Sequence, residues 1–189
     1  MIKRVFTVPR MQVKYWIDHK IHPFNSWALI SISSIDGFSK GDLDQLEFLG
    51  CKKIITETFH DISSVVEFGN TDNTSGRIKN IMENSYDHPL ILFNESKAKN
   101  IIKFIDCINI LDIETLVVNC SAGVSRSGAV GLFACRYLKL NEYIFRNDNP
   151  SIFPNPFVLE VLNKESGLNN EYVKAWTTFD PVSADEIFL

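Results

Sequence analysis

The sequence predicts a single α/β domain in which a central, mostly parallel sheet is flanked by helices. Short apolar segments rich in β-branched residues alternate with segments of helical character, which is the pattern of parallel α/β proteins. The length of 189 residues is enough for one sizeable core. No internal repeat and no linker-like segment divides the chain. We therefore expect one domain over residues 1–189, with a tail over 171–189 that packs partly and then frays.

The first half of the chain is expected to supply three strands and one helix. Apolar and β-branched residues mark the strands, and a turn signal at residues 36–37 closes the second of them. A polar break over residues 60–63 closes the third. The predicted elements are a strand over Val5–Val8 ended by Pro9, a helix over Met11–His19, a strand over Trp27–Ser33 and a strand over Lys52–Phe59.

The second half begins with a segment rich in Gly, Asn, Thr, Asp and Ser over residues 69–76, which predicts a loop. A short helical turn is expected over 77–84. Apolar residues at one helical face then predict a helix that starts at Asn94 or Ser96. The remaining expectations are a buried strand over Thr115–Asn119, a mostly apolar helix from Arg126, a loop over 147–156 and a helix over Pro156–Lys164 that ends near Gly167.

The composition of the chain bears on which partners it can bind and in which cell compartment it works. Apolar residues make up 45% of the chain and charged residues 22%, and the net charge is -4, which argues against nucleic-acid binding. No apolar run is long enough to cross a bilayer, and the N-terminus does not read as a signal peptide. The four cysteines lack the spacing of a metal site or a disulfide framework, so we expect a reducing cytoplasm and no metal or cofactor. Cys107 and Cys135 are expected to be core residues.

The segment from Asn119 to Gly128 predicts an anion-binding loop. A buried strand leads into a cysteine and a run of small residues, and Arg126 then opens an apolar helix. Loop N–H groups and the positive end of the helix dipole would face one centre. A cysteine at the floor of such a loop is expected to be a thiolate, and the arginine fork suits a tetrahedral anion. The alternative is an ordinary buried cysteine on a strand-to-helix turn.

This motif, a cysteine and an arginine separated by five residues and followed by serine and glycine, resembles the signature of cysteine-dependent protein tyrosine and dual-specificity phosphatases. With looser matches at Trp27–Ile32, Thr58–Asp61 and Pro154–Asn155, the chain is similar to small tyrosine-phosphatase-like proteins of bacteria and their phages over a core of about residues 25–165. The resemblance implies hydrolysis of a phosphoester through a phosphocysteine. The implied phosphate-binding residues are Ser121, Ala122, Gly123, Val124, Ser125 and Arg126, and the implied catalytic residues are Cys120, Arg126, Asp61 and Ser127.

The general acid has two candidates. Members of this family use an aspartate on a loop after a neighbouring strand, and Asp61 follows such a strand. Asp87 lies 33 residues before Cys120, a spacing close to that of small dual-specificity members, but no strand precedes it. We favour Asp61, which makes residues 65–89 an insertion after the acid loop. Asn155 could lie near the loop, although a helix cap before Pro156 is the better interpretation.

One position departs from the family pattern, because Asn119 replaces the histidine that normally precedes the cysteine. Its amide is expected to donate one of the same hydrogen bonds. The predicted function is a protein tyrosine phosphatase, with dual specificity open, acting on a phosphorylated protein or peptide. The alternatives are a phosphatase for a nonprotein phosphate ester and a catalytically weak phosphate-binding module. We expect no nucleic-acid or membrane partner, and the sequence does not predict an oligomeric state.

Overall fold

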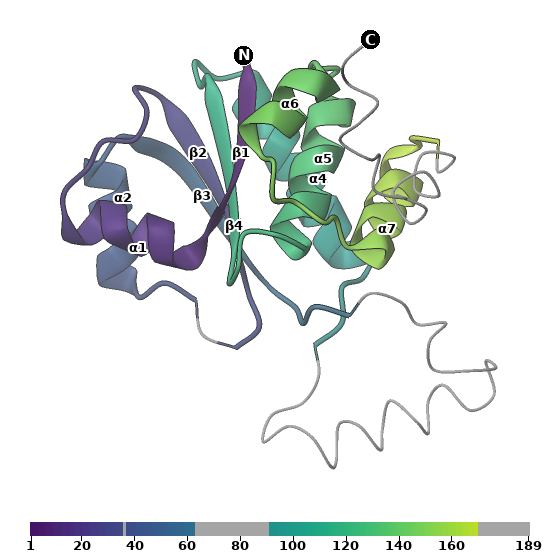
Figure 1. The fold of residues 1–189 in the computed structure, drawn as a ribbon, viewed down its shortest axis with the longest axis horizontal. Helices are drawn as coiled ribbons and strands as arrows, with labels where there is room; N and C mark the ends of the chain where they lie inside the picture. The colour runs from purple at the N-terminus through teal and green to yellow at the C-terminus, as the bar shows by residue number, and fades with distance from the viewer. Residues whose placement is uncertain (36, 63–90, 170–189) are drawn as a thin grey trace, which may run out of the picture.

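The computed structural model describes residues 1–35, 37–62 and 91–169 of the chain (Figure 1). Within these ranges it contains four strands and six helices. The strands are β1 (Arg4–Pro9), β2 (Trp27–Ser33), β3 (Cys51–Thr58) and β4 (Thr115–Cys120). The helices are α1 (Arg10–Asp18), α2 (Lys40–Phe48), α4 (Glu95–Asn109), α5 (Arg126–Tyr137), α6 (Glu142–Asp148) and α7 (Pro156–Ser166).

The four strands form one sheet in the order β1-β4-β2-β3, and every neighbouring pair is parallel. The parallel sheet that the alternation of elements predicted is therefore confirmed. Parallel pairing brings the carboxyl ends of all strands to one edge, where open α/β sheets bind their ligands. In Figure 1 this edge is the one toward which β1 descends from the labelled N-terminus.

Helices cover both faces of the sheet, so the domain has three layers (Figure 1). One core cluster lies between the sheet and α1 and α2, and includes Val13, Trp16 and Leu46. A larger cluster lies between the sheet and the helices α4 to α7. All six residues of β4 are buried because the strand lies inside the sheet and is covered on both faces. Buried residues begin at Ile2, well before residue 25.

The predicted helix boundaries near the site are set by caps. Asn94 caps α4 by accepting a hydrogen bond of 3.1 Å from the N–H of Lys97, which decides between the two predicted starting residues. Asn155 caps α7 by accepting from the N–H of Val158 at 3.1 Å. Gly167 ends α7 in the left-handed region, with a φ of 75°.

Two helices were not predicted. In α2 only Leu46 is buried, so the apolar periodicity is too weak to indicate a helix. A signal was present all the same, because Ser39 and Asp42 form a capping box. Helix α6 has seven residues and overlaps the start of the loop predicted over 147–156. Its length leaves too few turns for a period to emerge.

One cysteine prediction is wrong. Cys135 is buried as expected, but Cys107 is exposed. The buried face of α4 consists of Ala98, Ile101, Ile105 and Ile108, and Cys107 is one residue, and so about 100°, away from Ile108 on the helix.

Several predictions fall outside the described residues. These are the loop over 69–76, the helical turn over 77–84, Asp87, the tail over 171–189 and Asp36 of the predicted turn. In the ranges that the structure does describe, no helix combines the length and the apolar character required to cross a membrane.

Candidate active site

Strand β4 carries Cys120 to the carboxyl edge of the sheet, and the loop over residues 121–125 connects it to α5, which starts at Arg126. The loop turns sharply at Gly123, whose φ is 76°. A Cβ at this position would overlap the backbone nitrogen of Pro9 and lie 2.6 Å from the carbonyl carbon of Val8. Only glycine therefore fits between the loop and the end of β1.

Backbone hydrogen bonds from two other segments fix the outside of this loop. The N–H of Arg10 donates to the carbonyl of Ser121 at 3.3 Å. Two residues between α6 and α7 do the same further along: the N–H of Phe153 donates to Val124 at 3.2 Å, and that of Asn155 to Ser125 at 3.1 Å. Because its carbonyls are engaged outward in this way, the curvature of the loop is set by the surrounding fold.

The guanidinium of Arg126 is buried and held along one edge. Its Nη1 donates to the carbonyl of Phe59 at 2.8 Å and to Ser34 Oγ at 2.9 Å, and its Nη2 donates to Ser121 Oγ at 3.2 Å. The residue is only 4% exposed. Its Nε has no hydrogen-bond acceptor in the described part of the chain, and the nearest carboxylate atom, Asp61 Oδ2, is 3.8 Å away.

Ser127 lies against the cysteine sulfur. The distance from Cys120 Sγ to Ser127 Oγ is 3.1 Å, and both side chains are buried. Ser127 is already inside α5, whose N-cap residue is Ser125. Ser127 therefore does not occupy the cap position of the helix, and its hydroxyl contacts the sulfur.

Asp61 follows β3 and reaches the same loop. Its Oδ1 accepts hydrogen bonds from Ser125 Oγ at 2.7 Å and from Asn155 Nδ2 at 2.8 Å. The structure thus brings Cys120, Arg126 and Asp61 to one edge of the sheet, as the strand ends predicted. Asp87, the other candidate acid, lies outside the described residues.

Asn155 does more than cap a helix. Besides accepting from Val158, its side chain donates to Asp61 and, at 3.1 Å, to the carbonyl of Ile62. It is 1% exposed. Both interpretations of this residue, near the loop and as a cap, are therefore correct, because the start of α7 lies beside the acid loop.

The expected hydrogen bond from Asn119 is not formed with any described residue. Neither atom of its amide has a partner in the ranges that the structure describes, although the side chain is fully buried. Successive side chains of a strand point to opposite faces, so Asn119 points to the α1 side of the sheet while Cys120 points to the α5 side. The neighbour of Asn119 in register on β2 is Ser31, whose buried hydroxyl also lacks a partner in these ranges.

The site includes two contributors that the sequence pattern did not single out, Ser34 and the carbonyl of Phe59, which hold Arg126. Ser125 was predicted as a phosphate-binding residue, and its hydroxyl also bonds Asp61. Ser34 and Phe59 each follow the end of a strand of the predicted parallel sheet. Their position at the carboxyl edge of the sheet could therefore have indicated that they lie at the site. That Phe59 binds Arg126 could not have been predicted from its residue type, because the bond uses its backbone carbonyl.

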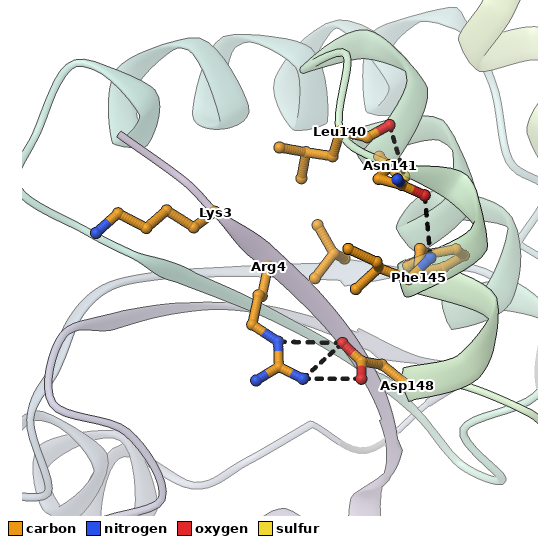
Figure 2. A pocket seen from close by; sticks show the side chains of 9 residues that line it. Lys3, Arg4, Leu140, Asn141, Phe145 and Asp148 are labelled. Atoms are coloured by element: carbon orange, nitrogen blue, oxygen red, sulfur yellow. Dashed lines mark hydrogen bonds and ion pairs between the residues drawn. The ribbon is translucent and has the colours of Figure 1, made fainter.

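A separate cavity of about 50 Å³ lies at the opposite end of β1 (Figure 2). Arg4 and Asp148 pair at this cavity through two hydrogen bonds of 2.8 Å and one of 3.1 Å. Arg4 is in register with Thr115, the first residue of β4, so the cavity is remote from Cys120. Within the described ranges, no group of three or more His, Cys, Asp or Glu side chains is arranged to hold a metal ion.

The remaining thiols differ in a way that alkylation can test. Burial raises the pKa of Cys51 to about 12 and that of Cys135 to about 11. Both stay protonated and shielded, whereas Cys107 is exposed. With iodoacetamide at about pH 8, the native protein is expected to be labelled at Cys107 and to remain unlabelled at Cys51 and Cys135 by peptide mass spectrometry. Denatured protein serves as the control, in which all four thiols react, and equally fast native labelling of Cys51 and Cys107 would contradict the assignment.

Comparison with solved structures shows the same fold elsewhere. The chain superposes on the crystal structure of Tk-PTP in its active form with a TM-score of 0.50 and 17% identity, over 87% of this chain and 92% of that one. A second match is PTPMT1 in complex with PI(5)P, with a TM-score of 0.46 and 12% identity over 92% and 94% of the two chains. No protein-family model and no curated protein sequence matches the chain. The likeness to Tk-PTP shows a shared fold, and this is the α/β fold that the resemblance at Cys120–Gly128 implied.

Proposed function

We propose that the chain is a cysteine-dependent phosphatase of the protein tyrosine phosphatase type. The observation that carries the proposal is the buried Arg126, whose Nε has no hydrogen-bond acceptor among the described residues and lies 3.8 Å from Asp61 Oδ2. This distance is too long for a hydrogen bond, so the buried N–H is unsatisfied, which is costly, and an anion in the loop would relieve that cost. Nε and the second N–H of Nη2 then form the fork that binds two oxygens of a phosphoryl group.

The reaction follows from the positions of three side chains. The Cys120 thiolate attacks phosphorus, the S–P bond forms, and the P–O bond of the ester breaks as Asp61 gives its proton to the leaving oxygen. A water molecule then attacks the phosphocysteine, Asp61 takes a proton from it, and the S–P bond breaks to release inorganic phosphate. Ser127 Oγ, 3.1 Å from the sulfur, would donate to the departing thiolate.

The loop supplies charge stabilisation rather than covalent chemistry. Backbone N–H groups of Ser121 to Ser125, with the start of α5, would surround the equatorial oxygens of the phosphoryl group. The outward hydrogen bonds of the loop carbonyls hold this arrangement before substrate arrives. Such preorganised donors are the main source of catalysis in phosphoryl transfer.

A phosphorylated protein or peptide is the substrate class that the surroundings of the loop favour. No lysine lies in the loop, although a polyanionic substrate would be expected to recruit one. Three exposed apolar side chains, Met11, Ile35 and Phe153, belong to segments that contact the loop or Arg126. Met11 is next in sequence to Arg10, which bonds the loop, and Ile35 is next to Ser34, which bonds Arg126. The backbone N–H of Phe153 itself donates to the carbonyl of Val124. These surfaces suit the ring of a phosphotyrosine and apolar neighbours in a peptide.

A second candidate is a phosphate-binding module with weak catalysis. Asn119 favours it, because the residue that normally precedes the cysteine is replaced by one that makes no hydrogen bond to the loop in the described structure. The two candidates share the anion site and differ in turnover. Turnover is therefore the quantity that separates them.

The test compares wild type with Cys120→Ser, using p-nitrophenyl phosphate and a phosphotyrosine peptide. We expect hydrolysis by wild type, complete loss in Cys120→Ser, and retained peptide binding by that variant in titration calorimetry, because the loop and Arg126 remain. Cys107→Ser is the matched control and should keep full activity, since this thiol is exposed on α4. Absence of wild-type turnover at every pH from about 5 to 8, with binding retained, would favour the binding module.

A further inference from the structure

Among the described residues, hydrogen bonds hold Asp61 through one of its two carboxyl oxygens. Oδ1 accepts from Ser125 Oγ at 2.7 Å and from Asn155 Nδ2 at 2.8 Å, whereas Oδ2 accepts no hydrogen bond from a described residue and lies 3.8 Å from Arg126 Nε. We propose that Ser125 and Asn155 are positioning residues that keep Oδ1 unprotonated, so that the proton of the general acid is carried by Oδ2 on the side of Arg126. This inference rests on the proposed phosphatase function.

The direction of the hydrogen bond from Asn155 is fixed by the backbone around it. The carbonyl of Ile62, 3.1 Å from one end of the amide, requires a donor, and the N–H of Val158, 3.1 Å from the other end, requires an acceptor. The amide can satisfy both only with Nδ2 toward Ile62 and Asp61. Nδ2 donates and cannot accept, so Asp61 Oδ1 must be the acceptor of this bond.

Protonating Oδ1 would therefore break an interaction that protonating Oδ2 leaves intact. A proton on Oδ1 would compete with the N–H of Asn155 and with the Ser125 hydroxyl for the lone pairs of one oxygen. A proton on Oδ2 displaces no hydrogen bond. The side chain of Asp61 is 40% exposed, so solvent can reload the proton after each turnover.

The same two residues connect the acid to the phosphate-binding loop. The backbone N–H of Asn155 donates to the carbonyl of Ser125, whose own hydroxyl bonds Asp61. The acid loop, the phosphate-binding loop and the start of α7 are thus joined by one set of hydrogen bonds. The position of the acidic proton relative to the bound phosphoryl group follows from that connection rather than from Asp61 alone.

The test uses two aryl phosphates that differ in how much they need an acid. Phenyl phosphate releases a strongly basic phenoxide, whereas 2,4-dinitrophenyl phosphate releases a leaving group that needs no proton. Asn155→Asp keeps an oxygen to cap α7 and removes the donor to Asp61. We expect kcat for phenyl phosphate to fall by about 10²-fold or more, and kcat for 2,4-dinitrophenyl phosphate to fall by less than about tenfold.

The matched control is Asn94→Asp, the same change at the cap of α4, which should leave the ratio of the two rates unchanged. Ser125→Ala removes the other donor without touching a cap and should lower the same ratio. Equal losses on both substrates in Asn155→Asp and Ser125→Ala, or no change in either, would overturn the inference. Wild type inactive on both substrates would instead refute the proposed function, so the two failures are distinguishable.

Discussion

Replacing Arg126 with lysine is expected to lower kcat by about 10²–10³-fold, even though the positive charge is kept. The planar guanidinium uses Nη1 for the carbonyl of Phe59 and leaves Nε free for a ligand oxygen. A lysine ammonium is a point charge and cannot hold the end of β3 and two phosphoryl oxygens at once. The loss should appear mainly in kcat, because the oxygens gain charge in the transition state.

The fold should also be weakened, because the arginine bonds a buried backbone group. Without it the Phe59 carbonyl loses a donor in a buried site, which costs about 1–3 kcal/mol in the free energy of unfolding. Urea unfolding measures this cost separately from activity. Unfolding and kinetics together therefore divide the effect of Arg126→Lys into a structural part and a catalytic part.

The matched control is Arg4→Lys. Arg4 also forms a forked pair, with Asp148, but at the other end of β1 and half exposed to solvent. Its replacement should leave kcat unchanged and cost less than about 1 kcal/mol, as exposed pairs do. An Arg126→Lys enzyme with wild-type kcat would mean that the free Nε does not bind substrate, and the proposed function would lose its main support.

The sequence was most informative where the residue pattern of a single element agrees with its expected place in the parallel sheet. The run Thr115–Asn119 predicts a buried strand, and the small residues after it predict a tight loop; the structure has both. The end of the Lys52–Phe59 strand predicts Asp61 at the same sheet edge, where its carboxylate lies within reach of Arg126. These predictions needed only residue order, because parallel strands bring their carboxyl ends together.

Two side-chain contacts of the site were not predicted correctly. The family resemblance implied a hydrogen bond from position 119, but strand alternation turns Asn119 away from the loop. For Asn155 the cap and a place near the loop were both considered, but its bond to Asp61 was not, because that bond depends on the start of α7 reaching the acid loop, 94 residues earlier in the chain. Contacts of such long sequence separation leave no periodic signal in the residues that make them.

Replacing Gly123 with alanine is expected to abolish detectable turnover and to lower the free energy of unfolding by more than the usual cost of a left-handed alanine, which is about 1–2 kcal/mol. The backbone there has a φ of 76°, and the new Cβ would overlap Pro9 and approach the carbonyl carbon of Val8 to 2.6 Å. Neither neighbour is a flexible side-chain end. Relief requires the loop or the end of β1 to move, and a shift of the loop would misplace its N–H groups relative to the phosphoryl oxygens.

Gly167→Ala is the control for Gly123→Ala, because it introduces the same backbone strain without a steric overlap. Gly167 has nearly the same φ, 75°, but an added Cβ would have no atom of a described residue within 4 Å. This variant should lose about 1–2 kcal/mol of unfolding free energy and keep its full kcat, because it ends α7 away from the loop. If Gly123→Ala lost no more stability than Gly167→Ala and kept its turnover, the loop would be able to move away from β1 without consequence. Since β1 pairs with β4 up to Pro9 and Cys120, such freedom would also mean that the strand does not fix the nucleophile.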